Sequence, residues 1–211
     1  LGERTNPKLL RHFPVSATMR GGDLKEGTHR ARSFLFAALG LVVARCFGLS
    51  HVDFCENGII SLNLPPLGQH VGARATRSTH PRALAGLSDL FTGLLGETAT
   101  VGNPLFWRTK KEVVTRIADL GLVCQIRDTR SCANVRSASR MTPHCGRCSQ
   151  CIDRRFAVLA AGLDSEDPEE AYALDLITGR RLREDRELSL GYVRAARRFR
   201  AMTPADLLKR Y

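Results

Sequence analysis

The longest apolar stretch of the chain runs from Phe34 to Phe47 and predicts a helix. Thr28 is the expected N-cap, because a threonine side chain accepts hydrogen bonds from the first turn of a helix. Gly48 is the expected end, because glycine tolerates the left-handed backbone that follows many helices. The stretch is apolar almost all round in its middle, so we expect the helix to be buried on more than one side.

Shorter apolar runs follow and are separated by turn residues. His51 to Cys55 predicts a short buried strand, which leads into a loop at Glu56-Asn57-Gly58. Ile59 to Leu64 is a second short apolar piece, stopped by two prolines. A polar loop with several arginines runs from Gly68 to His80 and is a candidate to cover a ligand. Pro81 then opens a helix that extends to about Leu95 and is closed by a glycine.

The next helix has a complete start signal. Thr109 is followed three residues later by Glu112, the spacing of a capping box, and the helix stops at Gly121. Leu122 to Ile126 predicts a short strand. After a cysteine-rich segment, a further helix runs through Phe156 to a glycine at position 162.

The C-terminal part is more polar. It contains an acidic turn at Asp164 to Glu170, a charged run from Arg180 to Glu187 and a basic helix around Tyr192 to Arg200. A final short helix starts at Thr203-Pro204. Helices that alternate with short apolar strands predict an α/β fold with a parallel sheet and crossover helices. We divide the chain into a domain over residues 1–162 and a helical extension over residues 163–211.

Composition places the chain among ordinary globular proteins, with 43% hydrophobic and 25% charged residues. The run from Ser33 to Leu49 is interrupted by Arg45, so it predicts a buried helix and not a membrane span. No secretory signal is visible, and we expect a cytoplasmic protein with no membrane partner. The net charge of +11 indicates either a solvated basic surface or a polyanionic partner, a nucleotide or a nucleic acid. The low aromatic content, 6%, argues against a platform that stacks single-stranded bases.

Four of the seven cysteines crowd into residues 132–151: Cys132, Cys145, Cys148 and Cys151. Thiolates with two-residue gaps can converge on one tetrahedral zinc ion, and Gly146 allows the tight turn between them. Because four thiolates leave no open position, we interpret the site as structural zinc and not as catalytic zinc. Unrelated buried cysteines and an iron–sulfur cluster remain alternatives. We expect the other three, Cys46, Cys55 and Cys124, to be inert thiols of the core.

Charged neighbours fit this interpretation. Five arginines would offset the negative charge of the thiolates: Arg136, Arg140, Arg147, Arg154 and Arg155. His144 is an alternative ligand, although its position next to Cys145 makes this sterically awkward.

The segment from Cys132 to Phe156 resembles the zinc knuckle of 7-cyano-7-deazaguanine synthases, which are PP-loop ATPases with an adenine-nucleotide α-hydrolase-like fold. Three upstream segments resemble the family in the same order: Arg30 to Ser33, Glu56 to Gly58, and Asn103 to Leu105 leading into Thr109 to Glu112. The cysteine knuckle is the specific motif; the other pieces are weak singly and gain strength from their order. The stretch from Glu56 to Pro65 is also similar to divergent relatives found in anti-phage defence systems.

The resemblance covers Gly27 to Gly162 and implies a ligase. Family members use ATP and Mg²⁺ to convert 7-carboxy-7-deazaguanine into 7-cyano-7-deazaguanine, with ammonia as the nitrogen source. The family's phosphate loop, Ser-Gly-Gly-x-Asp-Ser, is absent, and Gly21-Gly22-Asp23 lacks its serines and a preceding apolar strand. We therefore expect a fold that is incomplete at the N-terminus, and a chain that alone does not hydrolyse ATP.

The resemblance also implies contacts with the substrate. Arg30, Arg32 and Lys110 are candidates for the nucleotide's charges, although each arginine could equally be a solvated surface charge, and a lysine in the first turn of a helix is commonly just exposed. Arg77 is a further candidate for substrate binding, from the polar loop that could cover a ligand. Glu56 and Asn57 are candidates for hydrogen bonds to the base, or for shaping their loop. The family implies a homodimer.

Two other functions fit parts of the sequence. A zinc-knuckle module that binds nucleic acid would use the charge and the cysteines, but a zinc ribbon usually has two separated Cys-x-x-Cys pairs. A PP-loop enzyme that modifies tRNA would combine both features.

Overall fold

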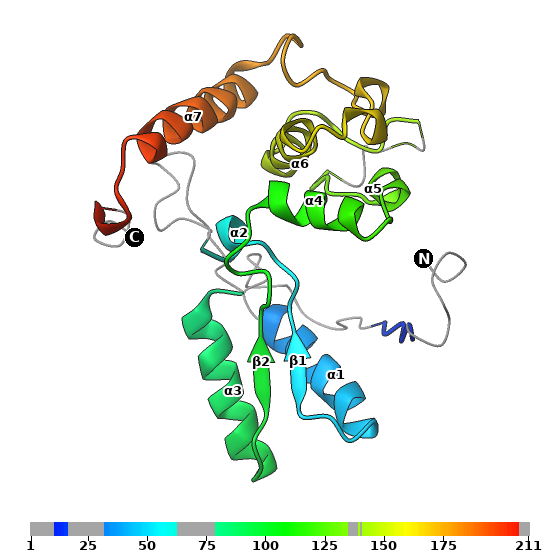
Figure 1. The fold of residues 1–211 in the computed structure, drawn as a ribbon, viewed down its shortest axis with the longest axis vertical. Coiled ribbons are helices and arrows are strands. Elements are labelled where there is room, and N and C mark those ends of the chain that lie inside the picture. The colour runs from blue at the N-terminus through cyan, green and yellow to red at the C-terminus, as the bar shows by residue number, and fades with distance from the viewer. Residues whose placement is uncertain (1–10, 17–31, 63–78, 135–138, 140, 207–211) are drawn as a thin grey trace, which may run out of the picture.

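The computed structural model describes residues 11–16, 32–62, 79–134, 139 and 141–206. Figure 1 shows two groups of elements: the sheet with its helices at one end, and α4 to α7 at the other. The elements, in chain order, are α1 (Arg32–Cys46), β1 (His51–Asp53), α2 (Gly58–Leu62), α3 (Pro81–Leu95), β2 (Thr100–Gly102), α4 (Lys110–Asp119), α5 (Cys124–Asp128), α6 (Ser149–Ala160), η2 (Asp164–Glu166), η3 (Glu169–Ala171) and α7 (Arg183–Arg200).

A two-stranded parallel sheet organises the first group. Val52 of β1 pairs in register with Val101 of β2. Helix α1 packs on β1 and α3 packs on β2, so the strands lie between two helices (Figure 1). Among the described residues the protein is therefore a mixed α/β structure with a small parallel sheet, as the alternation of elements predicts.

Helix α1 differs from its prediction. Ala37 and Leu41 are buried, but Phe36 is 52% exposed and Val42 is 63% exposed. The expectation that this helix is buried on more than one side is thus wrong for the part of the chain that the structure describes. The cause is that α1 packs on β1 along one side, where Gly40 lies close to Val52. None of the described helices has the length and apolar content of a membrane span.

Helix ends follow local signals closely. Gly48, Gly96, Gly121 and Gly162 follow α1, α3, α4 and α6, and all have φ near +70°. The capping box forms as predicted: the Thr109 side chain accepts from the Glu112 backbone N–H, and the Glu112 carboxylate accepts from the Thr109 backbone N–H. Each of these confirmed helix ends is specified by residues that lie within one helical turn of each other.

The strand predictions are only partly right. The strand at His51 is confirmed, but it ends at Asp53, and β2 has too few apolar residues to be predicted. The predicted strand from Leu122 to Ile126 is wrong, because this segment forms helix α5 and buries Ile126 alone. The apolar piece after Gly58 forms the short helix α2.

In the second group, α4 packs on α6, and the 3-10 turn η2 contacts both α5 and α6. Tyr172 and Leu176 pack with the buried cysteines, so residues beyond 162 contribute to the same core. The domain boundary at residue 162 stays a prediction. Helix α7 includes the predicted basic helix but starts earlier, at Arg183, and the last short helix starts at Pro204 as predicted.

Candidate metal centre

Four thiols converge in front of helix α6. The sulfur atoms of Cys132, Cys145, Cys148 and Cys151 all lie within 4.8 Å of one another. The Sγ of Cys151 is 3.9 Å from that of Cys145 and 3.5 Å from that of Cys148. Four sulfurs about 2.3 Å from a central zinc ion would be about 3.8 Å apart, so the group has the size of a tetrahedral zinc site.

Local backbone structure brings the thiols together. Cys148 is the N-cap of α6 and Cys151 lies in its first turn. Gly146 has φ +69°, and a Cβ there would lie 1.9 Å from the carbonyl oxygen of Leu174. The turn between the cysteines therefore requires glycine, both for its backbone angle and for the close approach of the chain.

Backbone N–H groups point at the sulfurs. Cys132 Sγ accepts from the N–H of Asn134 at 3.3 Å and of Cys145 at 3.4 Å. Cys145 Sγ accepts from the N–H of Arg147 at 3.4 Å. Such donors stabilise thiolates, the form in which cysteine binds metal.

The ionisation of the thiols is coupled. The hydrogen bond between Cys148 and Cys151 lowers the pKa of Cys148 to about 4 and raises the pKa of Cys151. Burial raises the pKa of Cys132. A bound dication would favour the thiolate form of all of them. The donor set, its spacing and its N–H partners thus fit zinc, which four thiolates would enclose completely.

His144 lies beside this group but outside it, since the converging ligand atoms are the four sulfurs. Its side chain is 1% exposed, and its ring centroid is 4.9 Å from that of Tyr172. Its backbone exchanges hydrogen bonds with Ala171 and Ala173. These bonds fasten the cysteine turn to the segment after η3, which gives His144 a position in the core.

The other three cysteines are not where the sequence places them. Cys46, Cys55 and Cys124 are all exposed in the structure, so their prediction as core thiols is wrong. Cys46 is the last residue of α1, Cys55 follows β1 after the strand has ended, and Cys124 opens α5 where a strand was predicted.

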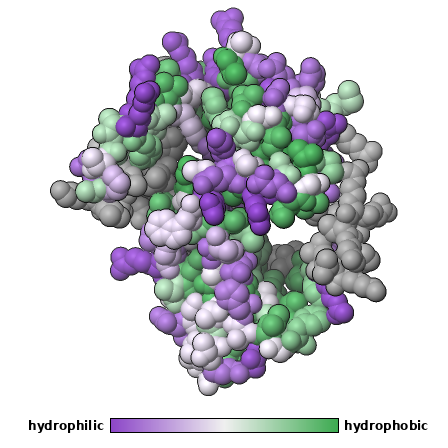
Figure 2. Space-filling model, in the orientation of Figure 1, coloured by the Kyte–Doolittle hydropathy of each residue, from purple (hydrophilic) through white to green (hydrophobic). Residues whose placement is uncertain are grey.

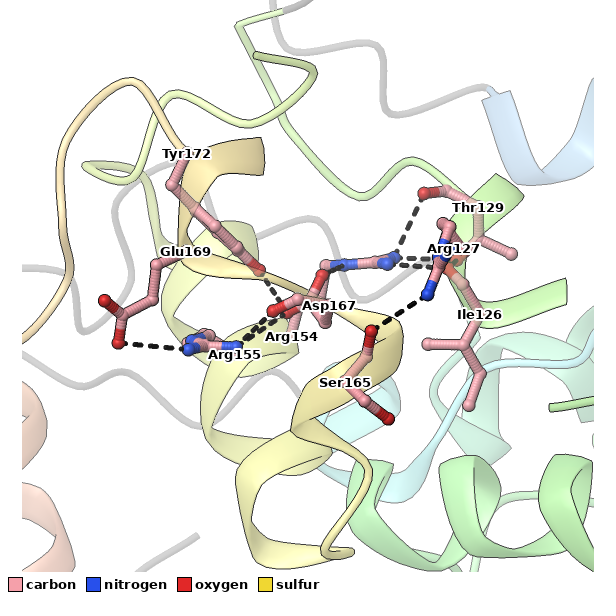
Figure 3. Close-up of polar contacts among 9 residues, drawn as sticks. All are labelled: Ile126, Arg127, Thr129, Arg154, Arg155, Ser165, Asp167, Glu169 and Tyr172. Carbon is pink, nitrogen blue, oxygen red and sulfur yellow. Dashed lines mark hydrogen bonds and ion pairs between the residues drawn. The ribbon is translucent and has the colours of Figure 1, made fainter. Parts of the chain in front are cut away.

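A buried charged network joins α6 to the segments around Ile126 and Asp167 (Figure 3). Arg154 Nε donates to Asp167 Oδ1 at 2.7 Å, and its other nitrogens donate to the carbonyl of Ile126 at 2.6 Å and to Thr129. Tyr172 OH donates to the second oxygen of Asp167 at 2.6 Å. Because Arg154 is 4% exposed and Asp167 is 1% exposed, each charge depends on the other.

Arg155 extends the network on the neighbouring side. It donates to the backbone carbonyl of Asp167, contacts Glu169, and lies over the ring of Tyr172. Sequence analysis gave both arginines only a role in offsetting thiolate charge and missed Asp167. The sequence held a signal for such a partner, because two consecutive arginines lie on the same helix as Cys151 and Ile152. Arginines that are buried with these residues need an acidic partner. Arg136 and Arg140 lie outside the described residues.

The residues predicted to contact the substrate are not all found in one place in the structure. Glu56 Oε2 accepts from Thr79 at 2.7 Å, and Asn57 Oδ1 accepts from the N–H of Ile60 at 3.2 Å, so both shape the loop after β1. Arg32 is exposed at the start of α1. Arg30 and Arg77 lie outside the described residues, as does most of the polar loop from Gly68 to His80.

Two of these residues line one cavity. The cavity has a volume of about 980 Å³, lies between α7 and the helices α4 and α6, and is lined by both Asn57 and Lys110. Burial lowers the pKa of Lys110, and the carboxylate of Asp153 opposes that shift. Tyr192 of α7 forms a hydrogen bond with Asp153, whose pKa burial raises. Lys110 is therefore a partly buried ammonium, not a freely solvated one.

Comparison with known proteins finds a similarity for one segment of the chain. Residues 87–162 match the family model described as "Queuosine biosynthesis protein QueC". The chain has no match among curated proteins or among solved structures. The matched segment extends from α3 through β2, Lys110 and all four clustered cysteines to the end of α6. Residues 87–162 are thus similar to part of the QueC family, and the match covers less than half of the chain.

Proposed function

We propose that this chain takes part in the ATP-dependent conversion of 7-carboxy-7-deazaguanine into 7-cyano-7-deazaguanine, or in a closely related activation of a deazaguanine. The observation that carries the proposal is the QueC match over the same segment in which the four thiols converge. A family match alone would identify a relative, whereas the convergent cysteines support the same interpretation from geometry.

The zinc proposed for Cys132, Cys145, Cys148 and Cys151 would act as a structural ion. It would supply a cross-link that fixes the start of α6 relative to Cys132, with no open coordination position for substrate. Arg154, one turn after Cys151 on α6, pairs with the buried Asp167 and would hold this helix to the segment that follows η2. ATP and Mg²⁺ belong to the proposed reaction of the family and have no residues assigned to them here.

Lys110 is the best-supported candidate for contact with the substrate carboxylate. It stands at the first position of α4 and lines the cavity with Asn57. In a partly buried place, a charge pair interacts more strongly than it does in water. Arg30, Arg32 and Arg77 remain proposals for the other charges of the ligands, and Glu56 for a contact with the base.

The test is calorimetric titration of the chain with 7-carboxy-7-deazaguanine. Lys110→Ala should weaken binding about tenfold or more, since a hydrogen bond to a charged group contributes about 1.5–3 kcal/mol. Arg116→Ala is the matched control, because Arg116 is an exposed cation of the same helix that does not line the cavity. Absence of binding to the unmodified chain, or equal effects of the two substitutions, would contradict the proposal.

A further inference from the structure

The cavity between α7 and α6 has an apolar interior. Its apolar lining comes from both sides: Ile152 and Phe156 of α6 face Leu190 and Val193 of α7, with Leu176 nearby. Figure 2 shows the molecule hollowed between α7 and the α4–α6 group, with hydrophilic side chains beside apolar ones. Helix α7 lies outside the segment matched by the family model, so this cavity has a wall that the QueC match does not include.

Arg181 lines this cavity and is held in a fixed position. Its Nη2 donates to the carbonyl oxygens of Gly146 and Leu176, both at 3.0 Å. Its Nη1 is buried and has no hydrogen-bond partner among the described residues. A guanidinium stays charged at any physiological pH, and a buried donor without a partner is costly. One terminal nitrogen of Arg181 is therefore anchored to the cysteine turn, while the other is a buried donor with no partner among the described residues.

The charges around the cavity favour an anion. Among the residues that the structure describes, five cationic side chains line it, namely Lys110, Lys111, Arg181, Arg186 and Arg197. Asp153 is the one acidic residue of this described lining, and it already interacts with Lys110 and Tyr192. A second copy of the chain is a poor occupant, because each copy carries a net charge of +11. An apolar interior with a cationic border instead fits a small molecule that combines an apolar body with one anionic group.

We propose that this cavity binds an organic anion with an apolar body, and that Arg181 Nη1 donates a hydrogen bond to its anionic group. The volume of about 980 Å³ suffices for a ligand of two or more fused rings or an acyl chain. Lys110 and Asn57 line the same cavity, so this inference deepens the proposed function and rests on it for the place of the ligand. Binding of a probe without ATP or a deazaguanine is measured separately, so that its failure is distinguishable from failure of the deazaguanine titration.

The proposal is tested with 2-naphthoate as the probe and with neutral 2-naphthamide as its uncharged counterpart, by calorimetric titration without ATP. The chain should bind 2-naphthoate at least tenfold more tightly than 2-naphthamide. Arg181→Leu should remove this preference. Arg82→Leu should keep it, because Arg82 is exposed in α3 and does not line the cavity. Equal binding of the two probes, or an unchanged preference in Arg181→Leu, would overturn the proposal.

A second variant keeps the test decisive if Arg181→Leu fails to fold. Ala196 is exposed on α7 and lines the cavity, so Ala196→Trp should fill it while leaving Arg181 in place. With unchanged far-UV circular dichroism, this variant should lose 2-naphthoate binding about tenfold or more. Retained binding in Ala196→Trp would place the probe elsewhere and overturn the proposal. Retention of RNA without any binding of 2-naphthoate would also overturn it, and would assign the cationic border to nucleic acid.

Discussion

The two groups of elements are stabilised in different ways. In the α/β half, residues 32–102, the core consists of apolar side chains such as Leu41, Phe91 and Val101. In the cysteine half, residues 110–200, apolar side chains are buried together with the thiols of Cys132 and Cys151 and the charged residues Arg154 and Asp167. Apolar packing tolerates changes in proportion to the volume lost, whereas a buried charge or thiolate depends on one particular partner. The comparison teaches that the cysteine half, which contains the four clustered thiols and the pair of Arg154 and Asp167, has the least replaceable contacts.

The largest expected effect on stability comes from a substitution of Asp167, in the cysteine half. Asp167→Ala should lower the free energy of unfolding by about 3–5 kcal/mol, because it leaves Arg154 buried without its partner. Asp119→Ala is the matched control at the exposed end of α4, and it should change stability by about 0.5 kcal/mol or less. Urea denaturation measures both. Equal effects would show that the charged network does not support the cysteine half.

A second substitution probes the apolar half. Leu41→Ala should cost about 2–5 kcal/mol, because Leu41 is 5% exposed and packs in the core beneath α1. Val42→Ala, at the adjacent exposed position of the same helix, should cost about 0.5 kcal/mol or less. Thermal unfolding of the two variants gives the comparison. A larger loss for Val42→Ala would mean that the exposed side of α1 is covered in solution.

Two glycines with the same backbone angle sharpen the comparison further. Gly146 and Gly121 have φ +69° and +72°, but only at Gly146 would a Cβ meet other atoms. Gly146→Ala should therefore cost about 2–4 kcal/mol, from backbone strain and from overlap with Leu174. Gly121→Ala should cost about 1–2 kcal/mol from strain alone. Unfolding by urea is the measurement, and identical losses would contradict the tight fit of the cysteine turn.

The smallest effect concerns the capping box of α4. Thr109→Ala should cost about 1 kcal/mol, whereas Thr98→Ala in an exposed loop should be nearly neutral. Hydrogen bonds from the backbone and side chain of Thr109 hold the pKa of Glu112 below its usual 4.5. A lowered folded pKa means that this contribution is present above pH 4.5 and is lost as the pH falls below it. The difference between wild type and Thr109→Ala should therefore shrink in acid, and a difference that grows would contradict the assignment.

The sequence predicted features that depend on neighbours along the chain. The C-terminal ends of α1 and α3, the capping box at Thr109 and the turn at Gly146 all have local signals, whereas the predicted N-cap Thr28 lies outside the described residues. The failures concern contacts between distant segments. Helix α5 was read as a strand because its few apolar residues do not distinguish the two, and only its packing against η2 decides between them.

The candidate site likewise combines residues that the sequence predicted with residues that it did not. The cysteine spacing indicated which four thiols meet, because their gaps are characteristic of metal ligands. Asp167, Tyr172 and Arg181 were not predicted, because their partners lie on other elements. The cavity itself depends on where α7 lies, which no residue pattern within α7 specifies.

The most direct measurement is the metal content of the purified protein, combined with X-ray absorption at the zinc edge. One zinc per chain, with four sulfur ligands at about 2.3 Å and no visible colour, is the expected result. Cys132→Ser should reduce zinc retention, while Cys124→Ser, at an exposed position outside the cluster, should not. A protein without bound metal, or a coloured one that contains iron, would contradict the account of the cysteine cluster as a structural zinc site.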